Sequence, residues 1–152
     1  MSRFLTRGFK LVALKTLKPS IELAQQHYQE HTGKPFFERI TKFISSSVVV
    51  AMVLEGDNVI DTSRKMIGAT SAANAELGTI RGDYALVGGK NCIHGSDSVE
   101  SAKREISLWF ADSEVYDPVD HHESWIYEKV TVVAKPAVVE TVQIDTCSAP
   151  KL

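Results

Sequence analysis

The stretch from Val48 to Leu54 constrains the fold more than any other part of the chain. It is almost entirely apolar, and β-branched valines lead it. Such a run is typical of a β-strand that is buried on both faces. We therefore expect a central strand in a sheet that carries helices.

Strands and helices alternate in the rest of the chain. Phe9 to Leu17 indicates a strand, a helix follows from Ser20 to about His31, and Pro35 begins a second helix. We then expect a short helix that carries apolar residues from Val59 to Ile67, and a strand from Gly82 to Val87. Neither a P-loop motif (GxxxxGKS or GxxxxGKT) nor GxGxxG occurs in the chain. The alternation favours an α/β sandwich in which helices cover an antiparallel or mixed sheet.

The composition suits one globular domain. The chain has 152 residues, 43% of them hydrophobic, which is enough for a core. The net charge is -2 and the 17 basic residues are scattered, so the basic stripe typical of nucleic-acid binding is missing. Two cysteines, Cys92 and Cys147, are too few for a disulfide framework and fit a reducing compartment. No apolar run could span a bilayer, and Met1-Ser2-Arg3 opens no signal-peptide pattern, so we expect a cytoplasmic location.

The stretch from Asn91 to Phe110 carries most of the candidate chemistry. Its second half predicts a helix, with Asp97 as the N-cap and Glu100 three residues later, as in a capping box. His94 then comes just before a helix N-terminus, where free N–H groups favour anions such as phosphate. An imidazole is also a competent nucleophile at neutral pH, and Glu105 is placed to orient the ring. On spacing alone, a capped surface helix preceded by an ordinary core histidine is the simpler interpretation.

A metal site is a competing interpretation of the same region. Cys92 and His94 would be ligands together with His121 and His122. The chain has neither the second cysteine pair nor the HExxH spacing that zinc sites show. We therefore favour Cys92 as a buried apolar residue in the segment that enters His94.

The literal sequence adds a family resemblance to these patterns. The run NCIHGSDSVESAKREISLWF, which contains His94, closely resembles the active-site segment of nucleoside diphosphate kinases, whose histidine is phosphorylated during turnover. GFKLVALKTL, HYQEH followed by KPFF, VVAMVLEG and GTIRGDY are similar to other family segments, so the resemblance extends from Gly8 to Glu128. It implies an α/β (α+β) fold of the ferredoxin-like class, with a four-stranded antiparallel sheet covered by helices. It also implies transfer of the γ-phosphoryl group from a nucleoside triphosphate such as ATP to a nucleoside diphosphate, through a phosphohistidine.

The resemblance also assigns residues to the histidine and to the phosphates. Glu105 and Ser96 match the groups that orient and assist the histidine. Arg64 and Thr70 match the residues that hold the distal phosphates, and Arg81 matches one that bridges toward the transferred group. No carboxylate cluster suggests a dedicated metal cage, so we expect Mg²⁺ to arrive with the nucleotide phosphates.

The nucleoside is assigned in the same way. Tyr28 matches the tyrosine beside the histidine, Phe36 the aromatic residue that stacks on the base, and Ile40 a neighbouring apolar contact. Asn91 matches the residue that bonds the sugar hydroxyl. Stacking on an aromatic ring suits broad base specificity. The family also implies a homo-oligomer, a hexamer or a tetramer, and neither a membrane nor a specific nucleic acid as partner.

Both ends of the chain depart from the family pattern. The family's central first strand and most of its first helix are missing, while after Glu128 the chain continues with an apolar stretch that ends in Lys-Pro, like the missing strand. We therefore expect residues 1–128 to form the domain and residues 129–152 to form a C-terminal extension with a flexible tail. Our hypothesis is that Val130 to Ala134 fills the vacant central position and that Lys135 replaces the family's phosphate-side lysine. The alternative is an unrelated tail.

A non-catalytic family member is the alternative function. An incomplete sheet leaves backbone groups unpaired, and each buried one costs about 1 to 3 kcal/mol. Such a chain would fold with partners. It would then be a catalytically weak or inactive subunit that binds nucleotide or regulates a hetero-oligomer.

Overall fold

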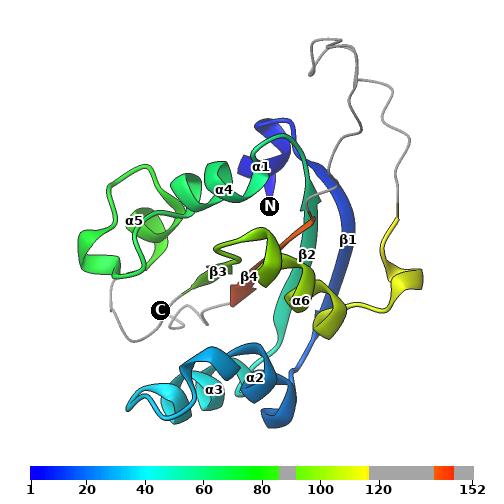
Figure 1. Ribbon diagram of the computed structural model, residues 1–152. Helices are drawn as coiled ribbons and strands as arrows, with labels where there is room; N and C mark the ends of the chain where they lie inside the picture. Colours follow the sequence, from blue (N-terminus) through cyan, green and yellow to red (C-terminus); the bar gives the residue numbers. More distant parts are fainter. Residues whose placement is uncertain (86–91, 117–138, 146–152) are drawn as a thin grey trace, which may run out of the picture.

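The computed structural model describes residues 1–85, 92–116 and 139–145. These residues form a four-stranded antiparallel sheet in the order β1-β2-β4-β3 (Figure 1). The strands are β1 (Lys10–Leu17), β2 (Val49–Glu55), β3 (Ile93–Gly95) and β4 (Val139–Asp145). The predicted fold class, a ferredoxin-like antiparallel sheet with helices, is confirmed.

β2 is the central strand that the apolar run predicts. β1 pairs with one of its edges and β4 with the other. Met52 and Leu54 belong to the core on one face of the sheet, while Val49, Ala51 and Val53 belong to the core on the other face. All of them are fully buried, which explains why this stretch lacks polar alternation.

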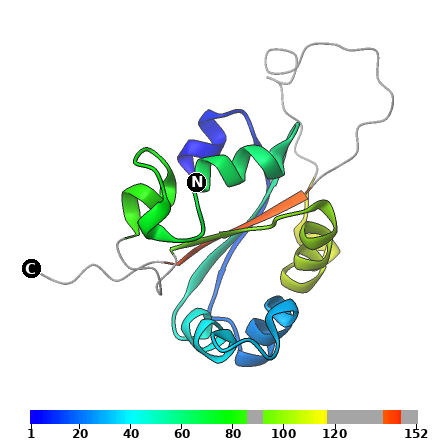
Figure 2. The ribbon, with the colours of Figure 1, turned by 60° about the vertical axis from the view of Figure 1, so that its left-hand side comes forward.

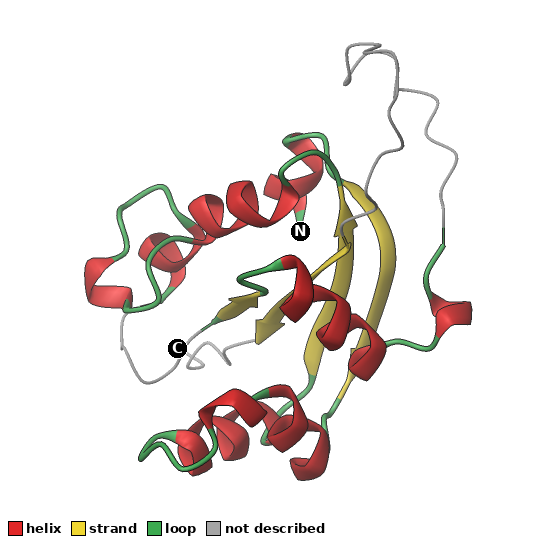
Figure 3. Cartoon of the chain, viewed as in Figure 1, coloured by secondary structure: helices red, strands yellow, loops and turns green. Residues whose placement is uncertain are grey.

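Helices cover both faces of the sheet (Figure 2). On one face lie α1 (Ser2–Thr6), α4 (Val59–Ile67) and α5 (Ile80–Tyr84), and on the other α2 (Ile21–His27), α3 (Phe37–Ser45) and α6 (Val99–Trp109). Short 3₁₀ turns are η1 (Gln29–His31), η2 (Ala72–Asn74) and η3 (Asp112–Glu114), and loops join them to the helices (Figure 3). None of the helices in the described residues is both long and apolar enough to cross a membrane.

β4 comes from a different part of the C-terminal extension than the sequence predicts. Val130 to Ala134 and Lys135 lie outside the described residues. The position between β2 and β3, which we expected that segment to fill, is occupied by Val139–Asp145. Both segments are short and rich in valine, and local pattern alone does not decide which of two such segments pairs.

The predicted strand from Gly82 to Val87 is wrong, because its first residues belong to α5. Thr79 caps this helix, and its Oγ1 accepts the backbone N–H of Gly82 at 3.1 Å. A Cβ added at Gly82 would lie only 2.0 Å from the carbonyl oxygen of Glu76. The glycine therefore serves close packing against the preceding loop, whereas the sequence pattern treats it as the start of a strand.

The other predicted helices are present with small shifts of their ends. Ser20 caps α2 by accepting the N–H of Leu23 at 3.1 Å. The N-cap of α6 is Ser98 and not Asp97, because Oγ of Ser98 accepts the backbone N–H of Ser101 at 3.1 Å. The capping box predicted with Asp97 is thus replaced by a serine cap one residue later. This places α6 directly behind the strand that carries His94.

Candidate active site

His94 lies in the middle of the short strand β3, with α6 packed behind it. Its Nε2 lies 3.0 Å from Oε2 of Glu105, a residue of α6. The His94 side chain is 25% exposed, whereas the Glu105 side chain is only 3% exposed. A buried carboxylate therefore stands behind a histidine that a ligand can reach.

Glu105 accepts more than one hydrogen bond. Oγ of the fully buried Ser96 donates to Oε2 of Glu105 at 2.7 Å. Nη2 of Arg104 lies 3.6 Å from Oε1. Burial by itself raises the pKa of the Glu105 carboxyl, but the hydrogen bond and the charge of His94, with smaller contributions from His27 and Ser96, outweigh it, and the pKa lies below its ordinary value. Glu105 is thus ionised at neutral pH and fixes the orientation of the His94 ring.

His27 fills the space behind His94. It is 1% exposed, and its ring centroid lies 4.5 Å from those of both His94 and Tyr28, with the rings nearly perpendicular. The indole N–H of Trp109 donates to Nδ1 of His27 at 3.1 Å. Burial, followed by the proximity of His94, lowers the pKa of His27 to about 3, so the ring is neutral. Because an indole N–H can only donate, Nδ1 is the acceptor and the ring proton is on Nε2.

His27, His94 and Glu105 form a cluster whose ligand atoms lie within 4.8 Å of one another. This spacing is compatible with a shared metal ion, but the chemistry of His27 is not. Its Nδ1 is taken by Trp109, and its Nε2, which has no hydrogen-bond partner among the described residues, carries the proton. Metal ions bind an unprotonated imidazole nitrogen, so these residues do not fit a resident metal centre.

Two arginines hold the backbone on either side of His94. Nη2 of Arg81 donates to the carbonyl oxygen of Ile93 at 2.9 Å, and its Nη1 donates to that of Gly68 at 2.6 Å. Nη1 of Arg64 donates to the carbonyl oxygen of the residue after His94 at 3.4 Å. Arg81 is 6% exposed, and burial lowers its pKa from the ordinary value, although a guanidinium stays charged. Both cations therefore lie next to the strand that carries the histidine.

Arg64 and Thr70 line the same surface depression. Its remaining lining residues come from α4, η2 and the loops that follow them. His94 and Arg81 are not among the residues that line this depression. Arg64 connects them through its bond to the backbone of β3.

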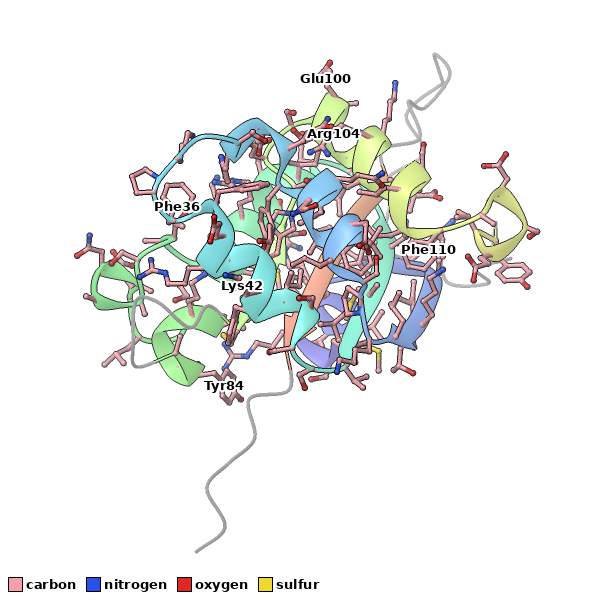
Figure 4. All side chains as sticks on the ribbon, turned by 90° about the horizontal axis from the view of Figure 1, so that it is seen from below. Phe36, Lys42, Tyr84, Glu100, Arg104 and Phe110 are labelled. Carbon is pink, nitrogen blue, oxygen red and sulfur yellow. The ribbon has the colours of Figure 1, made fainter. Side chains whose placement is uncertain are left out.

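The residues predicted to contact the nucleoside lie at different depths. Phe36 is 37% exposed, just before α3 (Figure 4), and Nζ of Lys34 lies 5.9 Å from its ring centroid. Ile40 packs against the core beneath it and is only partly buried. Tyr28 is 9% exposed, and its ring lies edge-on to that of His94 with the centroids 6.0 Å apart. The ring of Phe36 lies 5.4 Å from that of His31 between centroids, so an exposed aromatic ring lies near the histidines of this region.

Several predicted residues lie outside the described part of the chain. Asn91, predicted to bond the sugar, and Lys135, predicted to replace the family lysine, are among them. The same holds for His121 and His122, the two histidines of the competing metal interpretation.

Sequence reasoning missed three residues of the site. His27 opens the family-like string HYQEH, which is the one signal that pointed to it. Trp109 lies in the family-like run around His94, but nothing in the sequence links it to His27. Arg104 lies in the same run, and it donates from Nη1 to the carbonyl oxygens of Gln26 and His27 at 3.2 Å and 3.3 Å, contacts that the sequence does not indicate. It fastens the C-terminal end of α2 to α6.

An oriented histidine, a buried carboxylate behind it and arginines beside it, on an α+β sandwich, form a site that is suited to phosphoryl transfer. A family model described as nucleoside diphosphate kinase matches residues 1–115. The chain belongs to the nucleoside diphosphate kinase family, and its activity is that of a nucleoside diphosphate kinase.

Relatives and solved structures agree with this assignment. The chain is 52% identical to the nucleoside diphosphate kinase of Staphylococcus epidermidis and 56% identical to that of Carboxydothermus hydrogenoformans. Each match covers 128 residues, 84% of this chain and 86% of the relative. The fold is similar to a halophilic nucleoside diphosphate kinase from Halobacterium salinarum in complex with CDP, with a TM-score of 0.80 and 44% identity over 84% of this chain and 85% of that one. A nucleoside diphosphate kinase family protein from Babesia bovis gives a TM-score of 0.79 and 40% identity, over 83% of this chain and 85% of that one.

Proposed function

We propose that His94 is the residue that receives the phosphoryl group, and that it does so through Nδ1. The observation that carries this proposal is the contact between Glu105 and Nε2 of His94 at 3.0 Å. A carboxylate next to Nε2 keeps the ring proton there, so Nδ1 holds the lone pair that attacks phosphorus. Glu105 acts on the histidine as the carboxylate does in a catalytic triad, fixing the tautomer and stabilising the charged ring.

The reaction then proceeds in two displacements. Nδ1 attacks the γ-phosphorus of a nucleoside triphosphate, the N–P bond forms, and the bond to the β-phosphate oxygen breaks to release a nucleoside diphosphate. A terminal phosphate oxygen of a second nucleoside diphosphate attacks the same phosphorus, and the N–P bond breaks. Each step exchanges one bond to phosphorus for another, so the enzyme returns to its first state.

The charges around β3 support nucleotide binding. Arg64 and Thr70 bind the distal phosphates in this proposal, and Arg81 stabilises charge on the transferred group. Mg²⁺ enters as part of the substrate, bound to the phosphates, because the described residues offer no carboxylate cage for it. Lys135 and Asn91 complete the phosphate and sugar contacts.

Phe36 provides the platform for the base. A ring that is 37% exposed stacks on purines and pyrimidines alike, because every base has a π-face. In this proposal Tyr28 lies beside the histidine, and Ile40 makes a neighbouring apolar contact with the nucleoside. The complex of the Halobacterium salinarum relative with CDP supports this assignment of the substrate class.

We also propose a homo-oligomer, a hexamer or a tetramer, in the cytoplasm. β1 is an edge strand among the described residues, and Leu14 on it is 48% exposed, which suits pairing with a second copy. Two cysteines in the chain are too few for a disulfide framework, which suits a reducing compartment. Light scattering coupled to size-exclusion chromatography measures the number of subunits directly.

Labelling with γ-³²P-ATP tests the function. The wild-type protein should acquire label that is lost in acid and stable in alkali, as expected of phosphohistidine, and His94→Ala should acquire none. Addition of unlabelled GDP should remove the label from the wild type as GTP. A folded wild type that takes up no label would instead support the non-catalytic family member.

A further inference from the structure

His31 contacts both aromatic residues that are assigned to the nucleoside, and the proposed mechanism gives it no role. It is the last residue of the 3₁₀ turn η1, in the segment that joins α2 to α3. Its ring is stacked on that of Tyr28, with the centroids 6.1 Å apart and the planes inclined by 17°. The ring of Phe36 meets that of His31 edge-on, with the centroids 5.4 Å apart and the planes inclined by 68°.

The contacts of His31 connect the exposed platform to the candidate phosphoryl acceptor. Tyr28 is buried, and its ring lies edge-on to that of His94 with the centroids 6.0 Å apart. Phe36 is the exposed N-cap residue of α3. A continuous row of rings therefore runs from Phe36 through His31 and Tyr28 to His94. Because aromatic pairs favour stacked or edge-to-face arrangements, the His31 ring restricts the orientation of the Phe36 ring.

The ring of His31 is itself held by its neighbours in the turn. Nζ of Lys34 lies 3.2 Å from its Nδ1. An ammonium group can only donate, so Nδ1 is the acceptor and the ring proton is on Nε2. That nitrogen lies 3.9 Å from Oε1 of Glu30. The backbone N–H of Lys34 also donates to the carbonyl oxygen of His31 at 3.0 Å, which closes the turn. The side chain is therefore oriented although it is 29% exposed.

We propose that His31 is a positioning residue for the nucleotide base, which holds the ring of Phe36 in the orientation on which the base stacks. The role rests on the proposed function, in which Phe36 is the platform. Without His31, the Phe36 ring would have to be ordered when the base binds, and this ordering lowers affinity. His31 acts through Phe36 and not on one particular base, so purines and pyrimidines are affected alike. It takes no part in the transfer of phosphorus, so binding changes and the chemical step does not.

Substitutions in the full-length protein test this role. Calorimetric titration with ADP and with CDP measures Kd in the absence of turnover, and a coupled assay at saturating nucleotide measures kcat. We expect His31→Ala to raise both Kd values about threefold to tenfold and to leave kcat within twofold of wild type. His31→Phe keeps an aromatic ring and should restore the affinity. Gln29→Ala, at an exposed position of the same turn, is the matched control and should bind like wild type.

A double-mutant cycle shows whether His31 acts through the platform. In the Phe36→Ala background, His31→Ala should weaken binding no further. Wild-type affinity in folded His31→Ala, a loss that His31→Phe does not restore, or a loss confined to one base would overturn the inference. Unchanged affinity in Phe36→Ala would instead contradict the proposed platform, so the two failures are distinguishable.

The wild-type protein provides a test that does not depend on the folding of a variant. Nuclear Overhauser contacts between the ring protons of His31 and Phe36 should be present in the free protein and should persist when ADP binds. Rings that separate in the ADP complex would contradict a positioning role for His31.

Discussion

Glu105 stands behind His94, with Oε2 of the carboxylate 3.0 Å from Nε2 of the ring. The carboxylate is almost fully buried, and its pKa is lowered despite that burial because His94 and Ser96 bond to it. In the proposed mechanism, a negative charge fixed at this point selects the tautomer of His94 and stabilises the ring when it becomes positively charged.

Glu105→Gln should slow turnover by about a hundredfold. The amide keeps the shape of the side chain but loses the charge that stabilises the phosphorylated ring. A coupled assay of ATP and a second nucleoside diphosphate measures kcat and KM separately, and we expect kcat to carry the loss. Glu100→Gln, at an exposed position of the same helix, is the control. Equal kcat values in wild type and Glu105→Gln would remove Glu105 from the mechanism.

His27 should make the protein acid-sensitive in the range below pH 6.5. Its pKa is about 3 in the folded state against 6.5 ordinarily, so the unfolded chain binds a proton first as the pH falls. The corresponding stability is fully present above pH 6.5 and is lost progressively toward pH 3, at up to ~1.4 kcal/mol per pH unit.

Urea denaturation at several pH values between 7.5 and 5 measures this slope. His27→Gln should flatten it, because the amide oxygen can still accept the indole N–H of Trp109 but does not titrate. The comparison stays above pH 5 because Glu105, whose carboxyl has an ordinary pKa of 4.5, contributes its own loss of stability below that range. The same slope in wild type and variant would show that His27 is protonated without penalty in the folded state.

Arg81→Met should destabilise the fold more than Arg64→Met. Arg81 is buried and donates to two backbone carbonyls, those of Gly68 and Ile93, whereas Arg64 is exposed and its one bond to β3 is 3.4 Å long. Carbonyls left unpaired in the interior should cost about 1 to 3 kcal/mol in the free energy of unfolding. Denaturant titration of both variants tests the order, and a larger loss in Arg64→Met would contradict it.

Val142→Pro should identify the segment that forms the central strand. Val142 stands opposite Met52 on one side and Gly95 on the other, and a proline there removes a ladder bond and clashes with its neighbours. We expect a loss of about 3 kcal/mol or more and with it the loss of phosphorylation. The same substitution at Val132, in the segment that the sequence favoured, is the matched comparison. A larger loss of stability for Val132→Pro than for Val142→Pro would show that the earlier segment, and not Val139–Asp145, forms the central strand.

Much of the fold was predictable because burial leaves a local trace in the sequence. The apolar run from Val48 to Leu54 predicted the strand that lies at Val49–Glu55, and the capping residues after His94 predicted the helix that follows it. Two predictions failed where distant packing decides. Gly82 is required by the carbonyl of Glu76, and β4 is selected by pairing with two strands far away in sequence.

Some residues of the candidate site could be predicted from a local motif, whereas others are brought together only by tertiary packing. His94, Ser96 and Glu105 lie in one contiguous string, so a family-like motif located them together. His27 could not be recognised as a partner of Trp109, because the two are brought together only by the packing of α2 against α6.

The central claim is that Glu105 leaves Nδ1 of His94 as the nucleophile. NMR of the phosphorylated protein with ¹⁵N-labelled histidine tests it most directly, because ³¹P–¹⁵N coupling identifies the nitrogen that carries phosphorus. We predict a single coupled nitrogen, Nδ1 of His94, and no phosphohistidine in His94→Ala. Coupling to Nε2, or to a nitrogen of any other histidine, would contradict the account.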